Sequence, residues 1–458
     1  MRVGAPDPSV TGSAGMAAVS GLVDRLGVVE SLDRHIGSLK TRDRGLSGGQ
    51  LLVALAGAQL LGQDSLAGLD RLREDVAGAV LAPVPTPPST TAGSLGRRFD
   101  ADRIAGIETG LAEVTERWMP LLPAQRRDEL ATRRPSIDLD GTDVEVYGRD
   151  KDGVAYNYQG QRCGRVHLAS WAEASMPLAA ELLSGNDDVR PHAAELLHRA
   201  LAALPAEVCA MPRVRADAGY FSADLAHAAV EAACDFAIAA KRNPACWRAL
   251  AAVPDDAWTA ARDMHGAEVA ACDYAPAGWP RDTYTIIRRV RIDTDELSAD
   301  GRSRRRRTVD PDQLTLALDG QLDHVYAVSF LVTNLPVSTA ADVVAVEAWF
   351  RGRVNIEERF REAKLGAALR HLPSGNKQVN EVWTWAALLA GAISVMLQSL
   401  TGLDDTAGRA RSARLRHHLL CTPARIVRHA RGLTLRLPPG HQLLPQVLAR
   451  IRALPVPA

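Results

Sequence analysis

Two aspartates occupy a stretch of the chain in which acidic side chains are unexpected. Between Ser136 and Thr142, Asp138 and Asp140 project from one face of a predicted strand, and Ile137 and Leu139 project from the other face. Carboxylates on a central strand of an apolar domain cost free energy unless a cation holds them. This stretch therefore predicts a metal site, with either aspartate as a candidate ligand.

A third aspartate stands at the end of a second predicted strand. The sequence from Val214 to Phe221 indicates a short strand that ends at Asp217 and is followed by Gly219 and a new helix. Ligand-binding and catalytic residues collect at such strand ends. An Asp close to a Gly is also a common turn signal, so this element is weak by itself.

The segment from Ala340 to Lys364 predicts one helix with a functional face. At about 100° per residue, an aromatic ring, a guanidinium, a carboxylate and an ammonium group fall within a stripe of about 60°. These groups belong to Phe350, Arg353, Glu357 and Lys364. Glu358 and Glu362 point elsewhere, so the geometry selects Glu357. The alternative is a simple ion pair between Arg353 and Glu357 on a solvated helix.

Asp140, Asp217 and Glu357 together match what phosphodiester chemistry requires. Two divalent ions about 4 Å apart activate a water or a 3′-hydroxyl and stabilise the leaving oxygen. Hard oxygen ligands suit Mg²⁺, and Mn²⁺ should substitute for it. The six cysteines are far apart and show no zinc-site spacing, so no soft ligand set competes.

The elements that must position these residues follow from the patterning of the chain. Residues 1–134 read as helices, with a capping box of Ser47 and Gln50. From Pro135 onward, three consecutive strands and then strands that alternate with helices predict an α/β domain, a mixed sheet flanked by helices. We expect this catalytic domain at 135–242 and 324–400, a β-rich insertion at 243–323, and a basic, helical region at 401–458.

Basic side chains are concentrated outside the predicted catalytic domain, although 54 basic and 54 acidic residues balance over the whole chain. From Thr406 to Ala458 there are ten arginines and no acidic residue, which is typical of an anion-binding flank or of a solvated basic tail. In the N-terminal region, Arg97 and Arg98 follow a short predicted helix. That helix suits a small DNA-reading domain or an ordinary helix-loop-helix.

One uncharged stretch, Val382 to Leu403, is long enough to cross a bilayer. Polar residues interrupt it and no second span accompanies it, so we expect a buried core helix and no membrane partner. The first residues lack the apolar stretch of a signal peptide, and we expect a cytoplasmic protein.

At this point the chain resembles the transposases of bacterial insertion sequences that have a ribonuclease H-like catalytic core. The resemblance is to the branch whose glutamate helix carries Tyr-(2)-Arg-(3)-Glu-(6)-Lys, with Phe350 here in place of the usual tyrosine. Within that branch the nearest group is the one filed as insertion sequences thirteen-eighty. Its pattern is resembled by Asp138 to Gly148, by Arg215-Ala216-Asp217, by the helix motif, by Leu66 to Arg73, and by Ala424 to Arg431 with Arg425, Arg428 and Arg431.

The resemblance implies a DDE transposase that acts on double-stranded DNA, at its own terminal inverted repeats and at a target, as at least a homodimer. It implies that Asp140, two residues before Thr142, is the first catalytic acid, and Asp138 would then orient a ligand or satisfy a buried donor. Arg353 and Lys364 would hold phosphates. A tryptophan of the insertion, Trp247, Trp258 or Trp279, would stack on a flipped base, or else pack in a small core.

Two alternatives stay open. One is a ribonuclease H-like nuclease that cleaves and never joins strands. The other is a catalytically dead, transposase-derived protein that only binds DNA.

Overall fold

The computed structural model describes residues 1–39, 45–148, 150–298, 300, 303, 306–404, 408–430 and 432–455. Within these residues, ten strands form one continuous mixed sheet. Its order is β3-β4-β2-β6-β7-β11-β10-β9-β8, and β5 pairs with β4. The strands are β2 (Ser136–Glu145), β3 (Ala155–Tyr156), β4 (Arg162–Trp171), β5 (Met176–Ser184), β6 (Arg213–Ala216), β7 (Asp235–Ala239), β8 (Thr259–Ala260), β9 (Ala267–Cys272), β10 (Tyr284–Asp293) and β11 (His324–Thr333).

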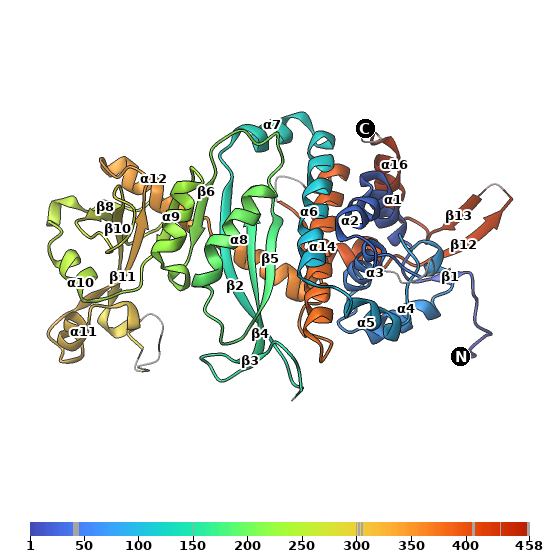
Figure 1. The fold of residues 1–458 in the computed structure, drawn as a ribbon, viewed down its shortest axis with the longest axis horizontal. Coiled ribbons are helices and arrows are strands. Elements are labelled where there is room, and N and C mark those ends of the chain that lie inside the picture. Colours follow the sequence, from blue (N-terminus) through green and yellow to red (C-terminus); the bar gives the residue numbers. More distant parts are fainter. Residues whose placement is uncertain are drawn as a thin grey trace.

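The centre of this sheet has the expected ribonuclease H-like arrangement. Strand β4 pairs antiparallel with β2 on one side and with β5 on the other, and β6 and β7 continue the sheet parallel to β2. Helix α8 (Arg190–Ala202) covers one face, and α13 (Val354–Arg361) with the long α14 (Lys377–Thr401) lies on the other (Figure 1). The prediction of a mixed sheet flanked by helices is confirmed.

The β-rich character of residues 243–323 is confirmed, and its strands extend the central sheet. Strand β10 pairs with β11 over ten residues, and β9 and β8 follow outward. Helices α10 (Pro244–Ala251) and α11 (Pro311–Leu318) complete this part, at the left of Figure 1, and α9 (Ala223–Glu231) stands between it and the core. The insertion therefore shares a backbone hydrogen-bond network with the strands that carry the predicted carboxylates.

The N-terminal region is helical, as predicted. It contains α1 (Met16–Leu26), α2 (Val28–Ile36), α3 (Gly48–Leu60), α4 (Ala67–Glu74), α5 (Ser89–Gly96), α6 (Ala101–Trp118) and α7 (Ala124–Thr132). The side chain of Ser47 caps α3 and forms the expected capping box with Gln50. Helix α14 packs against α3 and α6 as well as β5, so one apolar core runs from this region into the sheet.

Helix α14 is the one helix of the described residues that is long and apolar enough to span a membrane, and it is almost entirely buried in the protein. Its side chains pack in the shared core, as predicted for Val382 to Leu403.

The C-terminal region differs from the helical prediction. Between the short α15 (Ser412–Leu415) and α16 (Leu443–Ala453), a hairpin of β12 (Ala424–His429) and β13 (Gly432–Arg436) projects from the right end of the molecule (Figure 1). Strand β12 also pairs with β1 (Val10–Thr11), more than 400 residues away in the sequence. The pairing of β12 with β1 is too distant in the sequence to leave a local signal, whereas the hairpin of β12 and β13 is itself local and corrects the helical prediction.

Candidate active site

Asp140 lies in the middle of β2 with its carboxylate against a guanidinium. Oδ2 is 2.7 Å from Nη2 of Arg353, and Oδ1 accepts a hydrogen bond of 2.8 Å from the backbone N–H of Gly141. Burial raises the pKa of Asp140 to about 6, and the negative charges of Asp217 and Glu357 add to the rise while Arg353 opposes it. The carboxylates of Asp217 and Glu357 therefore lie near that of Asp140, and this region is called the carboxylate centre.

Asp217 reaches that centre because β6 runs parallel to β2. Ala216, the last residue of β6, stands opposite Leu139, so the next residue along each strand is a predicted acid. Oδ1 of Asp217 accepts a 2.7 Å hydrogen bond from the N–H of Gly219. A Cβ atom on Gly219 would lie only 2.8 Å from that oxygen, so a larger residue there would displace the Asp217 carboxylate.

Glu357 belongs to the first turn of α13, and its side chain is exposed. The residues around it correct the prediction of one helix from Ala340 to Lys364. Helix α12 (Ala340–Arg351) ends at Gly352, α13 begins at Val354, and a π-helical turn, Glu362–Gly366, follows. The predicted stripe of about 60° that holds Phe350, Arg353, Glu357 and Lys364 assumes one regular helix. It therefore does not describe these four side chains in the structure.

The backbone hydrogen bonds change at the interruption. The N–H groups of Gly352, Arg353, Asn355 and Ile356 bond three residues back instead of four, as in a 3₁₀-helix. A Cβ atom on Gly352 would lie 2.7 Å from Nη1 of Arg215, so the glycine lets that arginine approach the helix end. Phe350 lies before the break and packs, partly buried, on a small apolar cluster with Val343 and Val346.

Lys364 lies in the π-helical turn and reaches β2 just beyond Asp140. Its Nζ donates hydrogen bonds of 2.7 Å to Oγ1 of Thr142 and 2.8 Å to the carbonyl oxygen of Asp143. Burial lowers the pKa of Lys364. Both basic residues of the motif thus contact the strand that carries the first aspartate.

Asp138, the competing first acid, is fully buried and engaged elsewhere. Its two carboxylate oxygens accept hydrogen bonds of 2.6 and 2.9 Å from Nε and Nη2 of Arg215. Burial raises its pKa to about 6, and the paired guanidinium opposes the rise. Arg215 is a partner of this site that was not predicted from the sequence motif. An arginine on a central strand needs a buried partner, and that requirement was the available signal.

The donor set at this centre fits divalent cations. Carboxylate oxygens of Asp140, Asp217 and Glu357 are hard ligands of the kind that Mg²⁺ and Mn²⁺ prefer. Within the described ranges, no three acidic, histidine or cysteine side chains are yet close enough to hold an ion. Arg353 supplies the positive charge beside Asp140 instead.

The other predicted DNA-binding residues lie away from the carboxylates, with one exception. Arg97, Arg98 and Arg428 are exposed in the terminal regions, Arg425 pairs with Asp7 at 2.8 Å, and Arg431 lies outside the described residues. Trp279 is the exception. Its ring lies 4.8 Å from that of Phe221, which closely follows Asp217, and 5.9 Å from that of Phe236.

Trp247 and Trp258 are engaged farther out in the insertion. Trp247 packs edge-on against Phe330, and the guanidinium of Arg289 lies 3.9 Å from the ring centre of Trp258. All three tryptophans are partly buried. Each therefore makes packing contacts, as the alternative of packing in a small core predicts.

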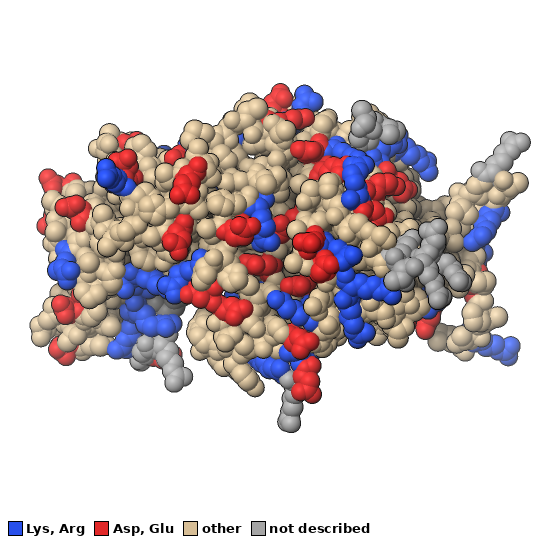
Figure 2. Space-filling model, in the orientation of Figure 1, with Lys and Arg blue, Asp and Glu red and all other residues tan. Residues whose placement is uncertain are grey.

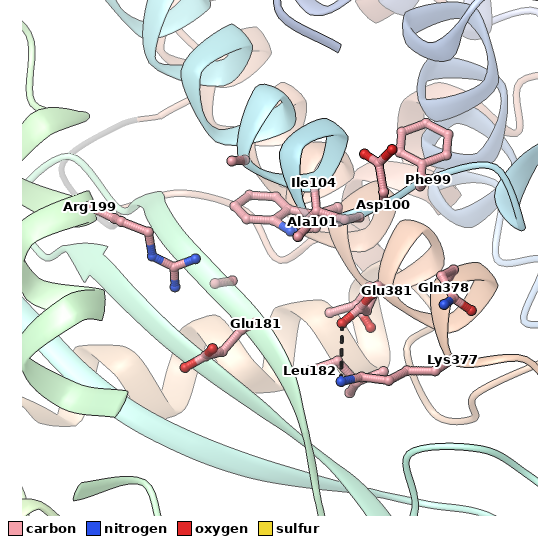
Figure 3. A pocket seen from close by; sticks show the side chains of 14 residues that line it. Phe99, Asp100, Ala101, Ile104, Glu181, Leu182, Arg199, Lys377, Gln378 and Glu381 are labelled. Atoms are coloured by element: carbon pink, nitrogen blue, oxygen red, sulfur yellow. Dashed lines mark ion pairs between the residues drawn. The ribbon is translucent and has the colours of Figure 1, made fainter. Parts of the chain in front are cut away.

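A separate pocket of about 310 Å³ lies between the N-terminal helices and the sheet (Figure 3). Glu181 of β5 and Arg199 of α8 line one side, and Lys377 and Glu381 of α14, whose charged atoms are 3.7 Å apart, line the other. None of the three predicted catalytic acids lines it. The pocket marks the junction of two regions and is not part of the carboxylate centre.

The model of the family described as transposase DDE domain group 1 matches residues 5–302 and 311–456. The chain belongs to this family. DDE transposases cut and join DNA, and the family generally uses divalent metal ions. No curated protein matches the chain.

Among solved structures, this DDE transposase chain is similar to one described as "Cryo-EM structure of piggyBac transposase synaptic complex with hairpin DNA". The identity is 9%, the TM-score is 0.40, and the match covers 89% of this chain and 80% of that one.

Proposed function

We propose that this protein is a DNA transposase that binds the terminal inverted repeats of its own element, cleaves the element ends and joins them to target DNA. The observation that carries the proposal is that the parallel strands β2 and β6 bring Asp140 and Asp217 side by side, next to Arg353 of the segment that carries Glu357. The reactions are metal-dependent hydrolysis and transesterification of phosphodiesters.

In this proposal Asp140, Asp217 and Glu357 hold two Mg²⁺ ions, which Mn²⁺ can replace. Bound there, the ions activate the attacking water or 3′-hydroxyl and stabilise the leaving oxygen. Arg353 exchanges its ion pair with Asp140 for a phosphate of the DNA, and Lys364, half-buried against β2, holds a second phosphate near the scissile bond.

Basic side chains beside the carboxylate centre support a DNA partner. Exposed Lys241 and Arg242 follow β7, and Nη1 of Arg242 donates to the carbonyl of Val328 on β11. Arg306 and Arg307 approach the same strand, because Val309 forms a bridge with Ala327. Figure 2 shows Lys and Arg side chains gathered on this lower-left face. The patch lies at the sheet edge where β6 ends in Asp217, so it can hold the DNA backbone there.

The finer assignments belong to the same proposal. They are a homodimer on two DNA ends, Trp279 as a base-stacking residue, Arg97, Arg98, Arg425, Arg428 and Arg431 as DNA contacts, a cytoplasmic location, and membership of the bacterial group thirteen-eighty. The motif residues Phe350, Arg353, Glu357 and Lys364 support the last of these.

The test uses a linear DNA that carries the repeats flanking the gene, a supercoiled target plasmid, and Mg²⁺ or Mn²⁺. We expect wild-type protein to cut at the repeat ends and to give end-joined target products, and Asp140→Asn, Asp217→Asn and Glu357→Gln to bind the repeats without cutting. Cleavage without joining would instead support the nuclease, and repeat binding without cleavage by the wild type would support the DNA-binding protein.

A further inference from the structure

A small pocket lies on the side of α13 that faces away from Glu357. Its volume is about 150 Å³, and it lies between α13, α14 and residues 409–412 of the C-terminal region. Arg359 comes two residues after Glu357, which places it about 200° around the helix. The charged residues that line the pocket are Arg359, Arg409, Arg411, Glu358 and Glu362.

Arg359 is the member of this pocket whose role the proposed reaction does not explain. Its side chain is half-buried, and among the described residues it donates no hydrogen bond and forms no ion pair. Burial lowers its pKa, although the negative charges of Glu362 and Glu358 oppose the shift. A desolvated charge without a hydrogen-bond partner destabilises the folded state. Such a group is explained where an ion completes it.

The two acidic side chains of the pocket are bound to other groups. Oε2 of Glu358 is 2.9 Å from Nη1 of Arg361, and its Oε1 is 3.3 Å from Nε of Arg411. Oε2 of Glu362 accepts a hydrogen bond of 2.7 Å from the backbone N–H of Ser412. Three guanidinium groups therefore line the pocket against two carboxylates, and positive charge is in excess.

Arg409 brings a second guanidinium close to that of Arg359. It donates hydrogen bonds to the carbonyl oxygen of Ala174 and to Oγ of Ser175, which fix it in place. Burial lowers the pKa of Arg409 to about 10, and the positive charge of Arg359 adds to the fall. An anion between the two guanidinium groups would relieve this repulsion.

We propose that this pocket binds a phosphate group, with Arg359 and Arg409 as its charged contacts. The planar guanidinium group matches the oxygen atoms of a phosphate, and the hydroxyls of Ser394 and Ser412 line the same pocket as neutral donors. The phosphate belongs to a DNA backbone or is a free ion, since both present the same oxygens. Bound there, it ties residues 409–412 to the helix that carries Glu357. The site does not require the metal of the proposed function.

The first experiment titrates inorganic phosphate into the full chain by calorimetry at constant ionic strength. We expect Arg359→Gln to weaken binding by about 10- to 100-fold, because a charge-assisted contact is lost. Arg361→Gln removes the same charge from the same helix outside the pocket and should stay near the wild-type affinity. Arg353→Gln, at the carboxylate centre, should also bind phosphate as wild type does.

Binding of terminal-repeat DNA distinguishes the two sources of the phosphate. If the DNA backbone occupies the pocket, Arg359→Gln should lower the slope of log affinity against log salt by about 0.9. If a free phosphate ion occupies it, the slope stays at the wild-type value and only the phosphate titration changes. Asp140→Asn should bind phosphate normally, so a failure of the metal site would leave these results unchanged.

Thermal unfolding in chloride buffer separates binding from packing. Arg359→Gln should unfold at the wild-type temperature or above it, and added phosphate should raise the unfolding temperature of the wild type more than that of the variant. Equal phosphate affinity and equal DNA slope in Arg359→Gln and wild type would overturn the proposal. With a lower unfolding temperature, that result would assign Arg359 a structural role. Loss of phosphate binding in Arg353→Gln alone would place the phosphate at the carboxylate centre and would also overturn it.

Discussion

Nη1 of Arg215 donates a 2.6 Å hydrogen bond to the carbonyl oxygen of Trp349, near the end of α12. The same guanidinium holds both carboxylate oxygens of Asp138, and it lies 5.5 Å from the centre of the Trp349 ring. Arg215 therefore joins β2, β6 and the helix end that leads to Arg353 and Glu357. The Asp138–Arg215 ion pair thus connects the strands with the helix end that leads to the glutamate helix.

This connection predicts different phenotypes for the two aspartates of β2. Asp138→Ala leaves the Arg215 charge buried and unpaired, a loss of about 3–5 kcal/mol in the free energy of unfolding. Asp140→Asn should change stability little and abolish end cleavage. Urea denaturation and a cleavage assay in Mg²⁺ and Mn²⁺ measure both effects. A stable, inactive Asp138→Asn protein beside an Asp140→Asn protein with residual turnover would reverse the assignment of the first ligand.

Arg353 should compete with the cation for Asp140. A charge-assisted hydrogen bond contributes about 1.5–3 kcal/mol, so Arg353→Gln is expected to tighten Mn²⁺ binding by about 10- to 100-fold. The same substitution should slow cleavage, because a phosphate contact is lost. Arg361→Gln is the matched control, since Arg361 pairs with Glu358 on the same helix and carries the same charge. Weaker Mn²⁺ binding by Arg353→Gln would show that the guanidinium supports the site rather than competing for it.

Glu108 on α6 predicts a pH dependence of stability. Burial raises its pKa from an ordinary value of 4.5 to about 7, although Arg199, at 3.3 Å, and the N–H of Ala180 oppose the rise. Because the folded protein binds this proton more tightly than the unfolded chain does, the stability contribution is fully present below pH 4.5 and is lost as pH rises to 7. The loss is at most about 3 kcal/mol.

Glu108→Gln should therefore flatten the decline in the free energy of unfolding between pH 5 and pH 8. Chemical denaturation across that range measures the slope. Glu129→Gln on α7, an exposed side chain, is the control and should keep the wild-type slope. An unaltered slope in Glu108→Gln would mean that another group titrates in this range.

The C-terminal arginines should be tested by substitution and not by deletion. Leu444, Val447 and Ile451 of α16 are buried, and Arg450 donates to the carbonyl of Thr401, so a truncation would damage the fold. Arg425, Arg428 and Arg436 lie on the hairpin. Replacing all three with Gln should weaken DNA binding and lower the slope of log affinity against log salt by about 0.9 per lost phosphate contact. Equal affinity and slope in a filter-binding titration would exclude the hairpin as a DNA contact.

Trp279 is the tryptophan of the insertion that packs on Phe221, four residues after Asp217, and we expect the largest effect there. Trp279→Ala should leave first-strand nicking intact and slow a later step, because a stacked base contributes about 1–3 kcal/mol. Trp247→Ala and Trp258→Ala serve as comparisons within the same insertion. Wild-type product profiles for all three, with lower unfolding temperatures, would leave packing as their role.

The sequence was sufficient where the required signal was local. Alternation along β2 placed Asp138 and Asp140 on one face, and a short strand before Asp217 was predicted. The parallel pairing of β6 with β2, which brings Asp217 beside Asp140, is seen only in the structure. The prediction of one helix from Ala340 to Lys364 was wrong, because a constant rotation of about 100° per residue assumes that the helix has no break. The break depends on Arg215, which is 137 positions before Gly352 and whose approach requires the glycine. Long-range contacts of this kind leave no periodicity in the sequence.

The strands of the insertion extend the catalytic sheet, and this has a mechanical consequence. A lid attached by two flexible linkers can swing without disturbing its base, but β11 is hydrogen-bonded to β10 on one edge and to β7 on the other. Force applied to the outer strands is carried through these bonds as twist. It reaches β7 and then β6, the strand that ends immediately before Asp217. The outer strands therefore cannot shift relative to the catalytic edge without straining these backbone hydrogen bonds.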